Sequence, residues 1–472
     1  MAKPSANESF RDSLSTVDKR GKRIWIYPKK PSGRWTKYRT WVAWVLLVFL
    51  FGAPFVKING EQLILINVIE RKFVFFGHIF WPQDLYLFML AMLTGIVFIA
   101  LFTVVFGRLF CGWVCPQTIF MEMVFRRIEY LIEGDYKQQK WLDKQPWNFE
   151  KIWKKSLKHA VFILISFFIG NTFLAYIIGS DALFEIITSP VTEHLAGFTG
   201  MVVFSGLFYG VFAFMREQVC TTVCPYGRLQ GVLLDRDSLV VAYDYKRGEG
   251  QTGRAKFRKN EDRKALGKGD CIDCHQCVDV CPTGIDIRNG TQLECINCTA
   301  CIDACNAMMN AVGLPENLIG YKSEASIAEG RKFKLTPRAW AYTGFLVILS
   351  GALLTLLLTR APIQTTLLRV PGTLYQQHDN GEVSNLYNYK LINKTNRELR
   401  VKFELDPPDA GRTEVVGGEV PVLKPAGMVQ GTMFIYTSPE NLTGLKTKMN
   451  VAVYANGEKM DEERTYFMGP VN

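Results

Sequence analysis

The sequence predicts a multi-domain chain: an α-helical membrane bundle, a small cysteine-rich α+β domain and an all-β C-terminal domain. Three observations predict this organisation: five long uncharged apolar runs, twelve cysteines confined to four short motifs, and strand-like alternation in the cysteine-free segment 361–472. Of the 472 residues, 48% are hydrophobic and 21% are charged, which is an ordinary balance, so the arrangement decides the class. Composition excludes a disordered or collagen-like chain, and length excludes a small disulfide scaffold.

The apolar runs predict five transmembrane helices. A spanning helix needs about 20 apolar residues, whereas buried core helices, the alternative, have about 10–14. The first 39 residues are polar and basic, so we expect no signal peptide ahead of the first helix. The predicted helices are 40–56, 85–107, 160–180, 195–215 and 339–359.

The distribution of Lys and Arg predicts the orientation of these helices. The first 39 residues contain 11 Lys or Arg residues and segment 108–159 contains 10, whereas segment 181–194 contains none. Basic loops stay on the cytoplasmic side, so we expect the N-terminus and segment 216–338 to be cytoplasmic and the C-terminal domain periplasmic, in a bacterial inner membrane. The basic tail, which includes Lys19, would also suit nucleic acid, but this topology explains it without a nucleic-acid partner.

Eight cysteines form two runs with one spacing. The first run is Cys271-x2-Cys274-x2-Cys277-x3-Cys281-Pro, and the second is Cys295-x2-Cys298-x2-Cys301-x3-Cys305, followed by Asn. This spacing is typical of bacterial two-cluster ferredoxins, in which the fourth cysteine of each run ligates the other cluster. Zinc knuckles and disulfides are the alternatives, but zinc sites pair two C-x2-C knuckles and disulfides are rare in the cytoplasm. We therefore expect one [4Fe–4S] cluster on Cys271, Cys274, Cys277 and Cys305, and another on Cys295, Cys298, Cys301 and Cys281.

The other four cysteines form two matched pairs, Cys111-x3-Cys115-Pro and Cys220-x3-Cys224-Pro, each after a predicted membrane helix. The pairs lie 109 residues apart, in a register that also aligns Asp135-Tyr136 with Asp244-Tyr245. We infer a duplicated unit, a two-helix hairpin followed by C-x3-C-P, which places both pairs at one membrane depth. If the motif is helical, both cysteines of a pair share one helix face.

Four thiols at one membrane face indicate a redox or soft-metal site. Thiolates select Cu(I), zinc or iron–sulfur clusters, so Cys111, Cys115, Cys220 and Cys224 are candidate copper ligands and reacting groups. Packed thiols, a reversible disulfide and a further cluster are the alternatives.

The C-terminal segment predicts an immunoglobulin-like sandwich without a disulfide. Alternating residues mark strands at 391–396, 400–404, 433–436 and 449–454, and Asn456-Gly457 predicts a type I′ hairpin turn. We expect this domain to serve docking or interaction.

Two basic segments flank these domains. Residues 126–158 mix Arg, Lys and Trp, which favours an interfacial amphipathic helix. Residues 246–268 predict a flexible linker or a dock for an acidic electron donor. The sequence has no nicotinamide, flavin or ATP fingerprint, so we expect electrons to come from a cytoplasmic donor.

The predicted domains are a tail at 1–39, a four-helix membrane domain at 40–245, a ferredoxin domain at 246–338, a fifth helix at 339–360 and the sandwich at 361–472.

These motifs, in this order, resemble the CcoG family, also called FixG or RdxA. The family comprises membrane-bound polyferredoxins that help to assemble cbb-type cytochrome c oxidase. The resemblance extends over nearly the whole chain, and all twelve cysteines match the family pattern. It implies a cupric reductase whose Cu(I) product reaches the oxidase by way of a copper-translocating ATPase and assembly factors.

The sequence is compatible with three functions. The first is a membrane metal reductase with two [4Fe–4S] clusters and copper as substrate or transient ligand. The second is a respiratory conduit that takes electrons from quinol, which requires a quinone pocket within the helices. The third is a non-enzymatic oxidase assembly scaffold that acts through its C-terminal domain.

Overall fold

The computed structural model divides into two compact units. The first comprises 1–52, 90–175 and 181–351, and the second comprises 53–89, 176–180 and 352–472. Residues 1–15 and Lys19 of the predicted basic tail lie outside the described residues. The structure describes residues 16–18, 20–69, 71–259, 261–372, 374–379, 381–395, 397–418, 420–425 and 427–470.

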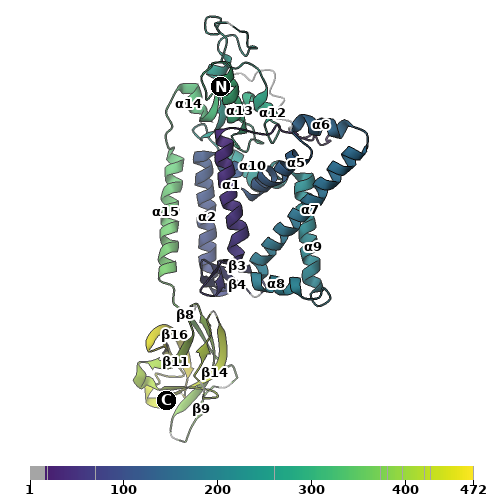
Figure 1. The fold of residues 1–472 in the computed structure, drawn as a ribbon. Helices are drawn as coiled ribbons and strands as arrows, with labels where there is room; N and C mark the ends of the chain where they lie inside the picture. Colours follow the sequence, from purple (N-terminus) through teal and green to yellow (C-terminus); the bar gives the residue numbers. More distant parts are fainter. Residues whose placement is uncertain are drawn as a thin grey trace. The chain divides into compact units, whose positions relative to one another are not determined.

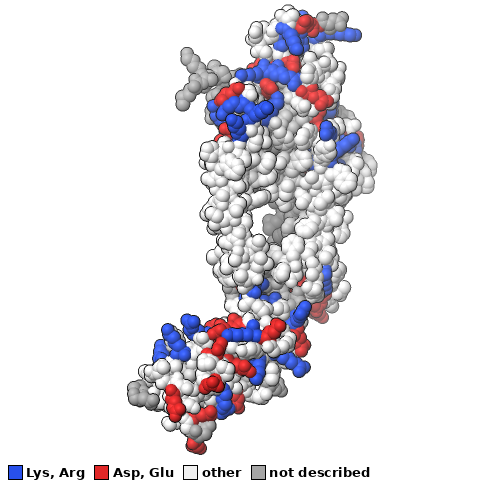
Figure 2. All heavy atoms as spheres, turned by 90° about the vertical axis from the view of Figure 1, so that its left-hand side faces the viewer, with Lys and Arg blue, Asp and Glu red and all other residues white. Residues whose placement is uncertain are grey.

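Five helices are long and apolar enough to cross a membrane, which confirms the predicted spans (Figure 1). On the face that Figure 2 draws, the band of these helices is almost free of Lys, Arg, Asp and Glu, and charged residues of both signs gather outside this band. The spans are α1 (Arg34–Gly52) with η1 (Ala53–Phe55), α2 (Leu85–Phe106), α7 (Phe149–Ile178), α9 (Leu195–Gly210) with the π-turn η4 (Val211–Met215), and α15 (Pro337–Leu358).

The prediction of one amphipathic helix over 126–158 is wrong. The segment forms α5 (Arg126–Ile132), α6 (Tyr136–Lys144) and the first turns of α7. Gly134 ends α5 with a φ of 87°, and the side chain of Asp135 then caps α6. The short elements beside the C-x3-C-P motifs are α3 (Leu109–Trp113), α4 (Pro116–Ile119), the π-turns η3 (Phe120–Phe125) and η5 (Val219–Val223), and α10 (Pro225–Leu233).

The ferredoxin segment packs two short helices on a small two-stranded sheet. Strands β6 (Val240–Tyr243) and β7 (Ile319–Lys322) pair antiparallel, and α13 (Ala300–Ala311) packs its buried face into the same core. Residues 246–268 are not simply a linker, because the buried guanidinium of Arg263 donates to the carbonyl oxygens of Gly269 and Cys271. The other elements are α11 (Tyr245–Glu249), α12 (Gln276–Asp279), η6 (Ile287–Asn289) and α14 (Glu324–Glu329).

The C-terminal segment is a β-sandwich, as predicted. One sheet has the strand order β12-β14-β10-β8, with β9 also paired to β10, and the other has the order β13-β11-β15-β16. Asn456 and Gly457 both have positive φ between β15 and β16, as a type I′ turn requires. The strands are β8 (Ile363–Arg369), β9 (Gln376–Gln377), β10 (Val383–Asn393), β11 (Leu399–Asp406), β12 (Arg412–Val415), β13 (Val422–Leu423), β14 (Met428–Thr437), β15 (Lys446–Ala455) and β16 (Glu458–Met468).

The second unit also contains short strands that the sequence did not indicate. Asp84, whose side chain is 1% exposed, holds the segment between α1 and α2 to the sandwich through ion pairs with Arg360 and Lys394. The strands are β1 (Lys57–Ile58), β2 (Glu61–Gln62), β3 (Ile64–Asn67), β4 (Lys72–Phe75) and β5 (His78–Phe80), and α8 (Ser180–Thr188) follows α7 in the chain.

Candidate iron–sulfur and thiol site

The two ferredoxin runs share an unusual backbone. Asp273 and His275 in the first run, and Asn297 and Thr299 at the matching positions of the second, all have φ between 51° and 65°. Such a conformation costs a non-glycine residue about 1–3 kcal/mol and persists only where the surroundings impose it. The repeated strain turns the chain tightly around the cysteines of each run.

The eight thiols gather in two sets, which we call the first and second thiol sets. The thiol of Cys305 lies in electrostatic range of Cys271 and Cys274 from the other run. In the same way, Cys281 is a charge neighbour of Cys295, Cys298 and Cys301. The fourth cysteine of each run thus lies with the first three of the other run. The first set is Cys271, Cys274, Cys277 and Cys305, and the second is Cys281, Cys295, Cys298 and Cys301.

The chemistry of these donors fits two [4Fe–4S] clusters. Burial raises the pKa of Cys277, Cys295 and Cys305 to about 12 and that of Cys298 to about 11. Such thiols stay protonated at neutral pH unless a cation offsets the thiolate charge, as cluster iron does. Within the described ranges, no three His, Cys, Asp or Glu side chains are arranged to hold a single metal ion. A cluster has no such requirement, because each thiolate ligates its own iron.

The remaining thiols, Cys111, Cys115, Cys220 and Cys224, are the membrane-edge set. In both motifs the second cysteine is the N-cap of a new helix and the proline takes the first helical position. The backbone angles agree closely, with φ −58° and ψ 124° at Cys115 and φ −70° and ψ 114° at Cys224. The helix breaks between the two cysteines of each pair, so the condition for a shared helix face, a helical motif, is not met.

The duplication nevertheless brings all four of these thiols together. Cys220 lies in electrostatic range of Cys115, Cys111 and Cys224. Burial, and then the neighbouring thiolates, raise the pKa of Cys220 to about 12, and burial followed by Cys115 does the same for Cys111. All four are half-buried free thiols. Because they do not already converge on one point, a shared ion would require their side chains to rotate.

The first C-x3-C-P motif packs directly on the second thiol set. A Cβ at Gly112 would lie 2.9 Å from the carbonyl oxygen of Asn297 and nearer still to that of Ile296, so only glycine fits there. Cys111 packs against the small core that contains Ile296 and Cys298. The second set in turn adjoins the first, because Cys301 is a charge neighbour of Cys277.

Two buried arginines fix this contact, and sequence reasoning missed both. Arg108 donates to the carbonyl oxygens of Leu293 and, at 3.3 Å, Cys295. Arg39 donates through Nε to the carbonyl oxygen of Gly112 at 2.6 Å. The only signal in the sequence is an arginine at a membrane boundary, where the topology already explains a positive charge.

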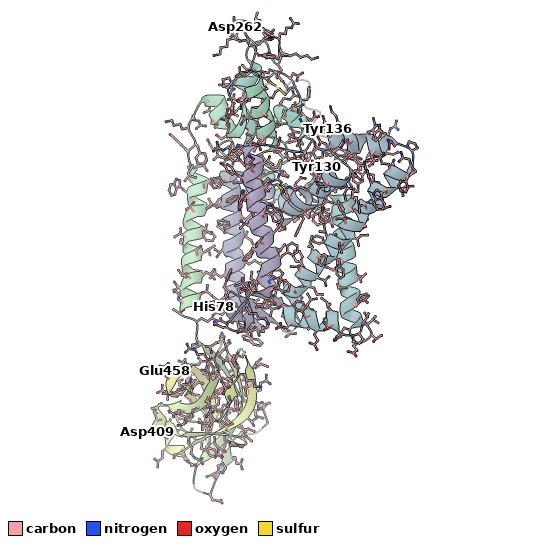
Figure 3. The ribbon with its side chains drawn as sticks, viewed as in Figure 1. His78, Tyr130, Tyr136, Asp262, Asp409 and Glu458 are labelled. Carbon is pink, nitrogen blue, oxygen red and sulfur yellow. The ribbon has the colours of Figure 1, made fainter. Side chains whose placement is uncertain are left out.

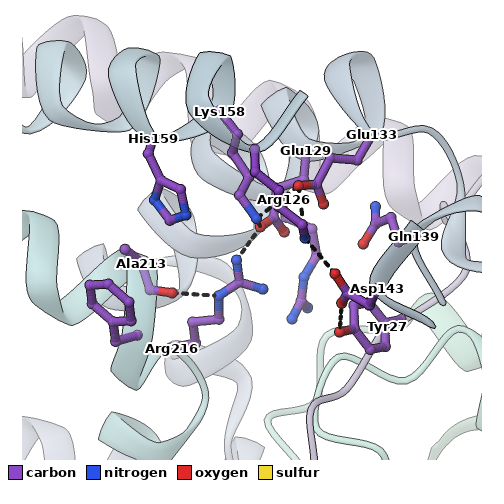
Figure 4. A network of polar contacts seen from close by, with 12 residues as sticks. Tyr27, Arg126, Glu129, Glu133, Gln139, Asp143, Lys158, His159, Ala213 and Arg216 are labelled. Carbon is purple, nitrogen blue, oxygen red and sulfur yellow. Dashed lines mark hydrogen bonds and ion pairs between the residues drawn. The ribbon is translucent and has the colours of Figure 1, made fainter. Parts of the chain in front are cut away.

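A cluster of polar side chains connects α5, α6 and α7, and nothing in the sequence indicated it (Figure 4). Glu129 pairs with Arg216 and with Lys158, and Lys158 also pairs with Glu133 at 2.9 Å. Burial alone would raise the pKa of Glu129, but Arg216 and Lys158 lower it below its usual range. The cluster thus ties α5 to α7 and to Arg216, which follows η4.

The fold and the thiol sets define a membrane-bound iron–sulfur protein that transfers electrons. Residues 215–324 match the 4Fe-4S dicluster domain family, residues 88–134 match a 4Fe-4S binding domain, and residues 353–470 match the Ig-like fold at the C-terminus of FixG. The first two matches together include all three thiol sets.

The chain belongs to the FixG/RdxA family of membrane polyferredoxins. It is 32% identical to protein RdxA of Cereibacter sphaeroides, over 94% of this chain and 97% of that one. Protein RdxB of the same organism is 33% identical over 79% of this chain and 80% of its own. The nitrogen fixation protein FixG of Rhizobium meliloti is 31% identical over 84% of this chain and 82% of its own.

Proposed function

We propose that this protein reduces Cu(II) to Cu(I) at the membrane-edge set and so supplies copper for assembly of a cbb-type cytochrome c oxidase. The contact of the Gly112 loop with Ile296 and Asn297 carries the proposal, because it joins the membrane-edge thiols to the second thiol set. In this proposal each of the first and second sets holds one [4Fe–4S] cluster. When bound, these clusters supply one-electron transfer, which is the change that separates Cu(II) from Cu(I).

The membrane-edge thiols suit the product of this reaction. Soft thiolates favour Cu(I), so they stabilise the reduced ion as it forms. Each Cu(II) accepts one electron, which originates in a reduced cytoplasmic one-electron donor, and thiols that bind the ion release their protons. Because the four thiols do not form a preset single-ion site, we expect the ion to be held transiently and passed on.

The sidedness and partners follow from topology and family. The basic segments support a cytoplasmic location of the three thiol sets at a bacterial inner membrane and a periplasmic location of the sandwich. Cu(I) then passes to a copper-translocating ATPase and to oxidase assembly factors, as the family resemblance implies.

The test is Cu(II) reduction by anaerobically purified full-length protein, followed with a colorimetric Cu(I) chelator. Replacing Cys111 and Cys220 by Ser should lower the rate more than tenfold while about eight irons per chain and the reduced-cluster EPR signals remain. The double variant Thr221→Ala and Thr222→Ala changes the same loop without touching a thiol and should keep the wild-type rate.

An unchanged rate in the cysteine variant, with its clusters intact, would refute the membrane-edge set as the copper site. Loss of iron in that variant would instead assign these thiols to a further cluster. Cluster reduction by quinol in membranes, without reduction of copper, would favour the respiratory conduit.

A further inference from the structure

A second candidate site lies where the N-terminal tail crosses α1 and α5. It is a cavity of about 240 Å³ whose lining includes Lys30, Arg39, Glu122, Arg127 and Tyr130. Tyr130, labelled in Figure 3, donates to the carbonyl oxygen of Pro28 at 3.0 Å and so holds the tail over the cavity. Neither the iron–sulfur chemistry nor the copper proposal uses this cavity.

The cavity has more positive than negative charge. Glu122 is engaged by Arg126, and the described residues provide no carboxylate ion pair to Arg39 or Arg127. The Arg39 side chain is 5% exposed, and its Nη2 has no hydrogen-bond partner in the described part of the chain. An unpaired buried charge is costly, and the described residues give neither buried Arg39 nor partly exposed Arg127 an anionic partner.

The contacts of Arg127 lead to the same conclusion. Its Nη2 donates to Thr40 Oγ1 at 2.6 Å, a neutral partner. Burial and the nearby Arg39 guanidinium lower the pKa of Arg127 from its usual value. Two like charges therefore face one space, and a bound anion would relieve both.

We propose that the cavity formed by Lys30, Arg39 and Arg127 binds a phosphate group. A guanidinium presents a planar fork of donors that matches phosphate oxygens, and two such forks beside a lysine give bidentate recognition. Arg39 lies in the first turns of spanning helix α1, and the exposed Leu131 lines the cavity. This position suits the head group of an anionic phospholipid, and free phosphate has the same chemistry.

Occupancy of this site should affect the second thiol set. Arg39 lies in electrostatic range of Cys298 and bonds the Gly112 loop. A phosphate on Arg39 would offset its positive charge and make addition of an electron nearby less favourable. The bound anion would therefore shift the midpoint potential of that centre to a more negative value.

The test uses full-length protein exchanged into phosphate-free detergent, with Arg127→Gln compared with Lys144→Gln. Lys144 is an exposed lysine in the last turn of α6 that does not line the cavity. We expect binding of phosphatidylglycerol, measured by native mass spectrometry, to weaken about tenfold in Arg127→Gln and to stay unchanged in Lys144→Gln. Lys30→Gln, on the exposed tail, should weaken it less, and iron content serves as the folding control.

The outcomes separate the sources of phosphate and are independent of copper reduction. Retention of phosphatidylglycerol without saturable binding of inorganic phosphate supports a lipid site, and the reverse supports free phosphate. In either case one cluster potential should become more negative on binding in the wild type. Equal binding by Arg127→Gln and Lys144→Gln of both probes would overturn the proposal, even if copper reduction is fully active.

Discussion

The two copies of the C-x3-C-P motif share a backbone but not their neighbours. In each copy a cysteine caps a helix that begins with proline, and an aspartate 20 residues farther on, Asp135 or Asp244, caps another. The residues around the first cysteine differ. Gly112 of the first copy corresponds to Thr221 of the second, and Arg108 corresponds to Glu217.

These substitutions give the copies different contacts. Gly112 and Arg108 meet backbone carbonyl groups of the ferredoxin segment, whereas Glu217 pairs with Arg23 of the tail at 2.8 Å and with Arg126 at 3.8 Å. The first copy thus contacts the second thiol set and the second copy is held in an ion-pair cluster. A duplication can keep four thiols together while the first copy packs its Gly112 loop on the second thiol set and the second copy packs its matching loop elsewhere.

Among the tests of this asymmetry, we expect the largest effect from Gly112→Val, compared with Thr221→Val. A side chain at Gly112 would collide with the carbonyl oxygens of Ile296 and Asn297, which cannot move without distorting the run that contains Cys298. We expect a loss of stability of about 3 kcal/mol or more, loss of one of the two cluster EPR signals and at least a tenfold lower rate of copper reduction. Iron analysis and EPR of the purified variants measure this.

Thr221→Val removes only a hydroxyl that bonds helix carbonyl oxygens of its own turn, and it should leave both signals intact. Equal damage from the two variants would mean that the copies have equivalent roles, and the asymmetry would fail.

The second largest effect is expected for Arg108→Met, which is compared with Glu217→Gln at the matching position. Loss of the Arg108 guanidinium leaves buried carbonyl oxygens at Leu293 and Cys295 without this donor, which should cost about 2–4 kcal/mol. Glu217→Gln removes a charge facing Arg23 and Arg126 and should destabilise by a similar amount. Only Arg108→Met should alter the EPR signal and potential of one cluster. An equal change of that potential in Glu217→Gln would contradict this separation.

The sequence predicted what depends on local pattern. Length and composition were enough for the five spans, and the Asn456-Gly457 turn followed from its dipeptide. The spacing of the ferredoxin cysteines predicted the two thiol sets that the structure brings together, and a fixed register predicted the four membrane-edge thiols.

The rest depends on contacts between distant residues. Nothing in the sequence near Gly112 indicates that Ile296 packs on it. The sequence also cannot distinguish an arginine that sets membrane topology from one that lines a binding cavity, as Arg39 does. The tail shows this limit well, because Arg23 was counted only as a positive charge although it pairs with buried Glu217. The length of segment 126–158 did not show that it forms α5, α6 and the start of α7 instead of one helix. The end of α5 depends on Gly134 alone.

The pH dependence of copper binding should show whether both copies of the motif bind the ion. The pKa values of Cys111 and Cys220 are raised to about 12, so both thiols are protonated at pH 6.5–8.5 and must lose a proton to bind Cu(I). The apparent affinity should therefore rise with pH, by about tenfold per pH unit for each proton released. Competition with a Cu(I) chelator at several pH values measures this slope.

Cys111→Ser and Cys220→Ser should each remove one proton from the slope, since the thiols occupy matching positions. A slope that falls in only one of the variants would show that a single copy binds copper. A slope of zero in the wild type would show that the thiols do not bind as thiolates.

The smallest expected effect concerns how each hairpin begins. The carboxylate of Asp303, on α13 of the ferredoxin segment, accepts from the backbone N–H groups of Trp35 and Thr36 at the start of α1, at 3.0 and 2.7 Å. In the second hairpin, Asn148 caps α7 locally by accepting from the Lys151 N–H at 2.8 Å. Asp303→Asn should cost about 1 kcal/mol, because it keeps the shape but removes a charge that favours the helix N-terminus.

Asn148→Ala should cost a similar amount, also about 1 kcal/mol, by loss of a local cap. The two variants should differ in the cluster signals, because Asp303 ties α1 to the run that ends at Cys305 whereas Asn148 has no such link. Thermal unfolding with EPR of the reduced protein measures both. If Asp303→Asn lowers stability without changing either cluster signal, then the link through Asp303 does not position the clusters.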